Sequence, residues 1–252
     1  MNDLKFIGII PARYSSQRFP GKPLADICGM IMIERVWRQT RRALDDVYVA
    51  TDDERIADAV NSFGGQVVMT RTDHRSGTDR CNEAYHKIGK QADVVINIQG
   101  DEPFIHPEQI EAIKECFVDP STQIATLARP LSADSSFETL SDPTKPKLVV
   151  DVNSYALYFS RSVIPYLRNV EQAAWPSTHR YLMHVGMYAY RTEVLNEITQ
   201  LPQSSLESAE SLEQLRWLEN GYRIKVGLTD KETIGIDTPA DLQRAIESLN
   251  RL

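Results

Sequence analysis

VVINI (Val94–Ile98) decides the fold: it is a run of apolar residues interrupted by a single asparagine, and the polar turn QGDEP (Gln99–Pro103) follows it directly. A strand with this continuous pattern, without polar alternation, is typical of the centre of a parallel sheet that helices cover on both faces. We therefore predict a buried central strand here, in an α/β protein.

Strand and helix patterns alternate on the N-terminal side of this strand. The predicted strands are Lys5–Ile10, Val47–Ala50 and Gln66–Thr70, and the predicted helices between them are Ile31–Leu44, Asp53–Phe63 and Thr78–Ile88. This regular alternation indicates a doubly wound α/β fold with a mixed, mostly parallel sheet and helices on both faces.

The pattern becomes less regular on the C-terminal side. A helix (Pro107–Phe117) and a strand (Gln123–Arg129) lead into residues 130–146, which are rich in Ser, Asp, Pro and Thr and predict a surface excursion. The β-rich runs that follow are Lys147–Val152, Tyr155–Ser160 and His184–Tyr190, then come helices at 192–199 and 208–220, a strand at Tyr222–Leu228 and a last helix from Pro239. Because no Gly/Ser linker interrupts the chain, we predict a single domain over residues 1–252.

Composition excludes several classes of protein. The 252 residues are 42% hydrophobic and carry a formal charge of −7, which argues against non-specific binding to nucleic acid or to a membrane. The apolar run Phe6–Ile10 is too short for a signal peptide or a membrane span, so we expect a protein that is not exported. The three cysteines form no CxxC pair, and we expect them to be buried or half-buried thiols in a reducing cytoplasm.

Positive charge is nevertheless concentrated near the N-terminus. Residues 1–42 contain eight basic and three acidic side chains, and the loop after the first strand, PARYSSQRFPGKPL (Pro11–Leu24), carries Arg13, Arg18 and Lys22 without an acid. Ligands of open α/β sheets bind at the carboxyl ends of the strands, so this loop predicts a phosphate site. Neither a GxGxxG nor a GxxxxGK[ST] motif is present, which argues against a dinucleotide oxidoreductase and a P-loop kinase. The alternative is a flexible loop with solvated cations.

Two aspartates are candidates for a metal site. Asp101 follows Gly100 directly after the central strand, and Asp237 precedes Thr238-Pro239, a predicted helix start. Mg²⁺ usually binds one or two protein carboxylates and completes its shell with phosphate oxygens and water. For either acid alone, a turn or capping role remains equally open.

Seven motifs along the chain resemble those of the 3-deoxy-manno-octulosonate (KDO) cytidylyltransferases, the CMP-KDO synthetases. They run in order almost from end to end: PARYSSQRFPGKPL, SGTDR (Ser76–Arg80), NIQGDEP (Asn97–Pro103), ALYFSR with IPY (Ala156–Tyr166), HVGMYAYR (His184–Arg191), ESLEQLRWLENG (Glu210–Gly221) and IDTPADL (Ile236–Leu242). The resemblance implies a Rossmann-like nucleotidyltransferase fold and a cytoplasmic homodimer that activates KDO for lipopolysaccharide synthesis. The predicted substrates are CTP and an eight-carbon 2-keto-3-deoxy sugar acid.

The resemblance also implies site residues. Arg13 and Lys22 would hold the triphosphate and, with Asp101, form the catalytic set, while Mg²⁺ would bind Asp101 and Asp237. The nucleotide pocket would be lined by Ala12, Arg13, Lys22, Ser76, Gly77 and Arg80, and the sugar would contact Gln99, Arg161, His184, Tyr188, Glu213 and Gln214. Without the resemblance, His184 reads as a core histidine, and Glu213 and Gln214 as a solvated helix edge.

Three further features of the sequence bear on these implications. Residues 147–190, with tyrosines 155, 158 and 166 expected to be exposed, would cover the sugar pocket or form the dimer surface. Ser154 stands where we expect glycine in the family, and the run from Gly227 to Ile236 departs from the common pattern, which affects the identity of the sugar more than the transfer. The alternatives are therefore the 8-amino analogue of KDO, more remotely a sialic-acid-like sugar, and a non-catalytic nucleotide-binding module.

Overall fold

The computed structural model describes residues 4–15, 18–232 and 235–249. Ser16 and Gln17 of the predicted phosphate loop therefore lie outside the described residues, as do two residues of the run before Asp237. The chain packs as two compact units. Unit 1 comprises Met1–Glu111, Ala189–Thr199 and Glu232–Leu252, and unit 2 comprises Ala112–Tyr188 and Gln200–Lys231. The single domain over 1–252 stays a prediction.

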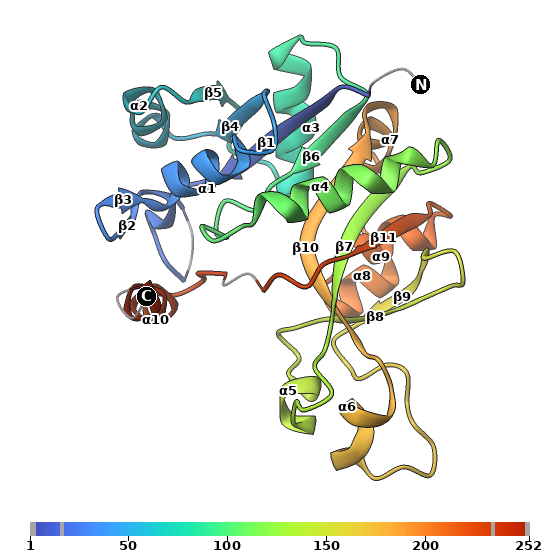
Figure 1. Ribbon diagram of the computed structural model, residues 1–252. Coiled ribbons are helices and arrows are strands. Elements are labelled where there is room, and N and C mark those ends of the chain that lie inside the picture. The colour runs from blue at the N-terminus through green and yellow to red at the C-terminus, as the bar shows by residue number, and fades with distance from the viewer. Residues whose placement is uncertain (1–3, 16–17, 233–234, 250–252) are drawn as a thin grey trace. The chain divides into compact units, whose positions relative to one another are not determined.

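Unit 1 contains the predicted parallel sheet (Figure 1). Its strands are β1 (Phe6–Ala12), β4 (Val47–Thr51), β5 (Gln66–Met69) and β6 (Val94–Asn97). β1 pairs with both β4 and β6, with Gly8 opposite Val47 and Ile9 opposite Asn97, and β5 pairs with β4. The helices are α1 (Met32–Thr40), α2 (Glu54–Ser62), α3 (Gly77–Ile88), α4 (Pro107–Glu115), which crosses into unit 2, α7 (Thr192–Ile198) and α10 (Pro239–Leu249). A short hairpin, β2 (Asp26–Ile27) and β3 (Met30–Ile31), precedes α1.

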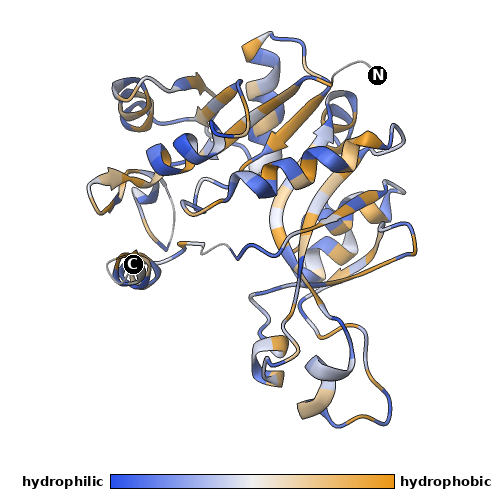
Figure 2. Cartoon of the chain, viewed as in Figure 1, coloured by the Kyte–Doolittle hydropathy of each residue, from blue (hydrophilic) through white to orange (hydrophobic). Residues whose placement is uncertain are grey.

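The centre of this sheet is covered on both faces. Successive residues of a strand point to opposite faces, and the neighbours Ile9 and Ile10 of β1 are both 0% exposed. Every residue of β6 is buried too, and Figure 2 shows these central strands mostly in hydrophobic colours. The continuous apolar pattern of the sequence thus arises from burial on both sides, and the predicted α/β fold is confirmed.

Unit 2 combines parallel and antiparallel pairing. β7 (Ile124–Pro130) and β11 (Ile224–Leu228) are parallel, with Ile124 opposite Ile224. β8 (Lys147–Val150) and β9 (Ala156–Ser160) are antiparallel, and β8 also pairs antiparallel with β10 (Leu182–Arg191), whose last residues belong to unit 1. The helical elements are η2 (Cys116–Val118), α5 (Phe137–Ser141), η3 (Gln172–Ala174), α6 (Trp175–Thr178), α8 (Ser205–Glu210) and α9 (Gln214–Glu219).

The surface excursion predicted at 130–146 is mostly exposed or half-buried, as expected, whereas the single helix predicted at 208–220 was wrong. The surface excursion at 130–146 contains α5, which Ser136 caps by accepting a hydrogen bond from the amide of Thr139. The predicted helix at 208–220 is two helices, because Ser211 adopts a left-handed conformation (φ 52°) that ends α8. Neither feature follows from hydrophobic periodicity.

Predictions of exposure also needed correction. Cys81 and Cys116 are buried thiols as expected, but Cys28 is exposed, in the turn between β2 and β3. Tyr155 is 5% exposed, because its ring packs against the guanidinium of Arg223, with the carbon at 3.7 Å from the ring centre. Tyr166, by contrast, is 73% exposed, as predicted.

Candidate active site

A cavity of ≈ 240 Å³ in unit 1 opens at the carboxyl ends of β1 and β6. It is lined by residues of the loops that follow these strands, by the start of α3 and by the segment before α10. All of the predicted nucleotide and metal residues line it, together with one predicted sugar residue: Ala12, Arg13, Lys22, Ser76, Gly77, Arg80, Gln99, Asp101 and Asp237. The structure thus brings these residues together from four segments of the chain.

Lys22 is fixed at the cavity by the local fold of the first loop. Gly21 adopts a left-handed conformation (φ 73°), and its amide donates to the carbonyl of Tyr14 at 2.9 Å. A Cβ atom at position 21 would also lie 3.1 Å from the ring of Tyr14, a tight contact, so both the backbone conformation and the available space favour glycine here. The chain then enters η1 (Lys22–Leu24), whose Pro23 is buried, and this turn holds the lysine in place.

Gly100 allows the loop after β6 to approach β1. A Cβ atom at this position would lie 2.8 Å from the carbonyl oxygen of Pro11, which is closer than real Cβ contacts allow. Absence of a side chain therefore lets Asp101 reach the cavity. There a carboxylate oxygen of Asp101 accepts a hydrogen bond from Nζ of Lys22 at 2.7 Å.

Asp237 reaches the same ammonium group from the far end of the sequence. The amide of Ile236 donates to the carbonyl of Asp101 at 2.9 Å, which ties the two segments together. A carboxylate oxygen of Asp237 lies 3.4 Å from Nζ of Lys22 and 2.9 Å from Nη2 of Arg18. Capping of α10 is performed instead by Thr238 and Asp241, which exchange side-chain to backbone hydrogen bonds. Asp237 is thereby left for a role in the cavity.

The two aspartates fit a hard divalent cation. No group of three or more His, Cys, Asp and Glu side chains suited to a metal occurs among the residues that the structure describes. Two carboxylates within reach of one positive charge are nevertheless a donor set that suits Mg²⁺ when phosphate oxygens supply further ligands. Lys22 already shows that both carboxylates can contact one cation.

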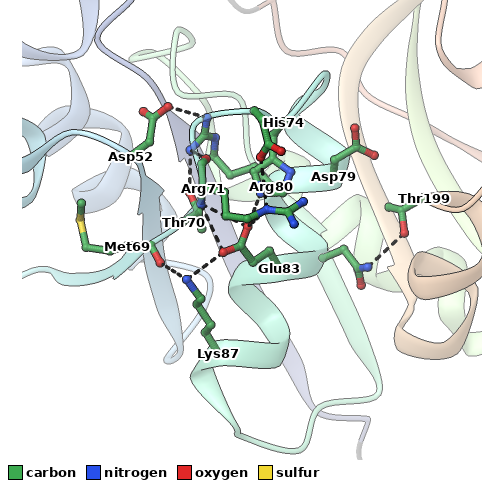
Figure 3. A network of polar contacts seen from close by, with 12 residues as sticks. Asp52, Met69, Thr70, Arg71, His74, Asp79, Arg80, Glu83, Lys87 and Thr199 are labelled. Carbon is green, nitrogen blue, oxygen red and sulfur yellow. Dashed lines mark hydrogen bonds and ion pairs between the residues drawn. The ribbon is translucent and has the colours of Figure 1, made fainter.

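The start of α3 forms another part of the wall. Ser76 caps the helix by accepting a hydrogen bond from the amide of Asp79, and Gly77 is its first residue. Arg80 is 3% exposed, and its guanidinium donates to Oγ1 of Thr70 at 2.6 Å and to Asp52 at 3.1 Å. Figure 3 shows these contacts beside His74 and Glu83. Side-chain hydrogen bonds thus hold both Ser76 and Arg80 in this part of the cavity wall.

The other predicted sugar residues belong to unit 2. His184 and Tyr188 lie on β10 with their rings 5.4 Å apart, and Tyr188 packs edge-on against Trp217 of α9. Glu213 and Gln214 stand at the start of the same helix. Gln214 is 4% exposed and its amide nitrogen is buried without a partner in the described residues, so a solvated edge is the wrong description of this residue.

Burial shifts the pKa values of His184 and Tyr188. Desolvation lowers the pKa of His184 to about 4, so its ring is neutral at pH 7, and its Nε2 lies 3.0 Å from Oγ1 of Thr126. Burial, followed by the nearby Glu213 carboxylate, raises the pKa of Tyr188 well above its usual value. The two side chains therefore act as neutral hydrogen-bonding groups.

Arg161 is bound to main-chain carbonyls. Its guanidinium donates to the carbonyls of Glu210 at 2.6 Å, Pro143 at 2.9 Å and Ser211 at 3.2 Å. These bonds join the end of β9 to the turn before Glu213. Two of its five N–H groups remain for other contacts in the described structure.

Several lining residues were not assigned to the site from the sequence. Arg18 belongs to the same basic loop as Arg13 and Lys22, so its charge was the available signal. His74 lies two positions before Ser76, and its ring contacts the carboxylate of Glu83. Asp52 and Glu83 do not line the cavity. They contact Arg80 and His74, which do, and nothing in the local pattern marks either acid.

A family model described as "Cytidylyltransferase" matches residues 7–226. The chain belongs to the cytidylyltransferase family. The match includes the basic loop, the start of α3 and Asp101, and together with the relatives described next it confirms the resemblance that the motifs indicated.

Individual cytidylyltransferases agree with this assignment. The chain is 64% identical over 247 residues to the 3-deoxy-manno-octulosonate cytidylyltransferase of Parabacteroides distasonis, covering 98% of each protein. It is also 64% identical to the enzyme of the same name from Bacteroides thetaiotaomicron, again covering 98% of each. A solved structure of CMP:2-keto-3-deoxy-manno-octonic acid synthetase complexed with CTP is 45% identical, with a TM-score of 0.89 over 98% of this chain and 99% of that one.

Proposed function

We propose that this cytidylyltransferase transfers the CMP group of CTP to the anomeric hydroxyl of KDO and releases pyrophosphate. Similarity over the full length to enzymes named for this reaction supports the proposal, as does similarity to a synthetase solved with CTP. The observation that carries it is the cavity of unit 1, where Arg13, Arg18 and Lys22 face the carboxylates of Asp101 and Asp237.

Charge repulsion is the main obstacle to this reaction. CTP and the sugar are both anions, and each pair of like charges 4 Å apart costs roughly 1 kcal/mol in water and about four times more at an effective dielectric constant of 20. Arg13 and Lys22 would bind the triphosphate and stabilise the charge that develops as the hydroxyl oxygen attacks the α-phosphorus in line. As this oxygen–phosphorus bond forms, the phosphorus–oxygen bond to pyrophosphate breaks, and the hydroxyl proton passes to solvent. Holding both reactants in this orientation supplies the rest of the rate enhancement.

Asp101 and Asp237 would hold Mg²⁺. When bound, the ion would neutralise phosphate charge and lower the pKa of the attacking hydroxyl. Lys22 would exchange its contacts with the two carboxylates for contacts with the triphosphate, since the same ammonium group is within reach of the cavity. Ala12, Ser76, Gly77 and Arg80 would line the cytidine pocket.

The predicted sugar residues of unit 2 would recognise the sugar. Their side chains offer what a polyhydroxy acid requires: neutral donors and acceptors from His184, Tyr188 and Gln214, and N–H groups of Arg161 for the carboxylate. Glu213 at the start of α9 would accept hydrogen bonds from hydroxyl groups. Gln99, which lines the cavity of unit 1, is assigned to the sugar by the family resemblance.

Released pyrophosphate tests the proposal. Purified enzyme with Mg²⁺ should form pyrophosphate and CMP-KDO from CTP and KDO, and far less product with ATP, GTP or UTP. Parallel reactions with the 8-amino analogue and with a sialic acid identify the preferred sugar. Binding of CTP without turnover of any of these acids would contradict the enzymatic function and favour a non-catalytic nucleotide-binding module.

We also propose a homodimer that works in the cytoplasm and supplies activated sugar for lipopolysaccharide. Unit 2 exposes apolar side chains that a partner subunit would cover, among them Val152, Leu157 and Leu228. None of the described helices is long and apolar enough to cross a membrane. Light scattering should give twice the mass of one chain, and Leu157→Glu should weaken the association. A wild-type protein with the mass of one chain would contradict the dimer.

A further inference from the structure

Arg80 is held by an unusually complete set of contacts for a residue that lines the cavity. Nη1 donates to Oγ1 of Thr70 at 2.6 Å and to the carbonyl of Arg71 at 3.2 Å. Nη2 donates to a carboxylate oxygen of Asp52 at 3.1 Å (Figure 3). The guanidinium group is planar and rigid, so three bonds fix its position and also the direction of its other N–H groups.

Asp52 supplies the charged contact. It follows β4 directly, at the carboxyl end of the sheet, and its side chain is 10% exposed against 4% for that of Arg80. An ion pair so deeply buried contributes little to stability relative to apolar residues, whereas removing one partner leaves a buried charge without compensation. The pair is therefore better explained by what it positions than by the stability that it adds.

The remaining donors of Arg80 suit a nucleobase. One hydrogen on Nη2 and the hydrogen on Nε have no partner among the described residues, and Arg80 lines the cavity beside Ser76 and Gly77. The phosphate-binding charges, Lys22 among them, come from the loop after β1. Cytosine presents two adjacent acceptors, O2 and N3, whereas N3 of uracil carries a hydrogen and would oppose a donor.

We propose that Asp52 is a positioning residue that orients Arg80 toward the O2 and N3 edge of cytosine, and thereby sets the preference for CTP over UTP. This inference rests on the proposed function for the identity of the nucleotide. Asp52 is not among the residues that line the cavity, so it acts through affinity and base selectivity and leaves the chemical step unchanged.

The test compares Asp52→Ala with its neighbour Asp53→Ala, with CTP and UTP as probes. Asp53 caps α2 and pairs with Arg55, so its loss removes a nearby aspartate without touching Arg80. We expect Asp52→Ala to raise KM for CTP at least tenfold with kcat within threefold of wild type, and to lower the CTP:UTP ratio of kcat/KM at least fivefold. Asp52→Asn, which keeps an acceptor oxygen, should recover most of the ratio. Asp53→Ala should leave the ratio unchanged.

Two further measurements keep the inference testable. If Asp52→Ala does not fold, Thr70→Val removes another anchor of Arg80 and should also lower the ratio. Calorimetric binding of CTP and UTP gives the same comparison without turnover, so a wild-type enzyme inactive toward KDO would contradict the proposed function alone. Unchanged CTP:UTP ratios in folded Asp52→Ala, or in Thr70→Val where Asp52→Ala does not fold, would overturn the role of Asp52.

Discussion

Nζ of Lys22 lies 2.7 Å from a carboxylate oxygen of Asp101, although 79 positions separate the two residues in the sequence. The same nitrogen lies 3.4 Å from Asp237, at the other end of the chain. Three charged groups from three segments thus meet at the carboxyl edge of one sheet. Their opposite charges stabilise this arrangement in the free protein, and a metal-bound triphosphate would replace the lysine contacts during turnover.

Substitution of either partner should abolish most of the activity. Asp101→Asn keeps the shape of the side chain but removes the charge, and Lys22→Ala removes a cation that would face the triphosphate. We expect kcat/KM for CTP to fall by about 10²–10³ in each case, as for other losses of transition-state charge stabilisation. The rate of pyrophosphate release at varied CTP concentration measures kcat/KM. Glu102→Gln, which neutralises the neighbouring carboxylate, is the matched control, and activity within a few fold of wild type in Lys22→Ala or Asp101→Asn would reject the assigned roles.

His184 should make stability depend on pH. Its folded pKa of about 4 lies below the value of 6.5 for a free histidine, so the unfolded chain binds a proton between these values that the native state does not bind. Stability is therefore complete above pH 6.5 and decreases as the pH falls toward 4, by up to about 3 kcal/mol. Urea unfolding at pH 7.5 and 5.0 measures the change in the free energy of unfolding between these pH values. His184→Gln should reduce this change. The same change in the variant as in wild type would show that other groups are responsible.

Arg161→Lys should separate a structural from a binding contribution. Lysine cannot reproduce the planar set of donors that joins three carbonyls, so we expect a loss of about 2–3 kcal/mol in the free energy of unfolding. KM for KDO should rise while KM for CTP stays constant, because the residue lies among the sugar-binding candidates. Arg168→Lys, an exposed position in the same unit, should change neither quantity. An increase in KM for CTP of similar size would argue against a specific role toward the sugar.

Ser154→Gly should stabilise unit 2. Ser154 has a φ of 62°, a left-handed conformation that is unfavourable for residues with a Cβ atom. Its amide donates to the carbonyl of Asp151, and its own carbonyl accepts from Val226, so the backbone is fixed there. Glycine relieves the strain but loses more chain entropy on folding, and we expect a net gain of up to about 1 kcal/mol. A lower melting temperature for the variant would contradict this explanation.

Local patterns predicted the elements of unit 1 well. Burial of Ile9 and Ile10 on opposite faces of β1, and of all of β6, appears in the sequence as continuous apolar runs, and this signal needs no knowledge of distant residues. Where the outcome depended on one backbone conformation or on a partner from another segment, the pattern failed. Ser211 divides a predicted helix in two, and Arg223 covers Tyr155.

The amino-acid sequence by itself determined the α/β fold, the basic loop and the family, because hydrophobic periodicity and motif order are properties of the chain. Only the tertiary structure decided that Asp101 and Asp237 both contact the ammonium group of Lys22. The same is true of the bonds from Arg161 to main-chain carbonyls and of the ion pair between Asp52 and Arg80. Such contacts join residues far apart in sequence. Their geometry depends on strand register and on close approaches such as that of Gly100 to Pro11, which no local pattern encodes.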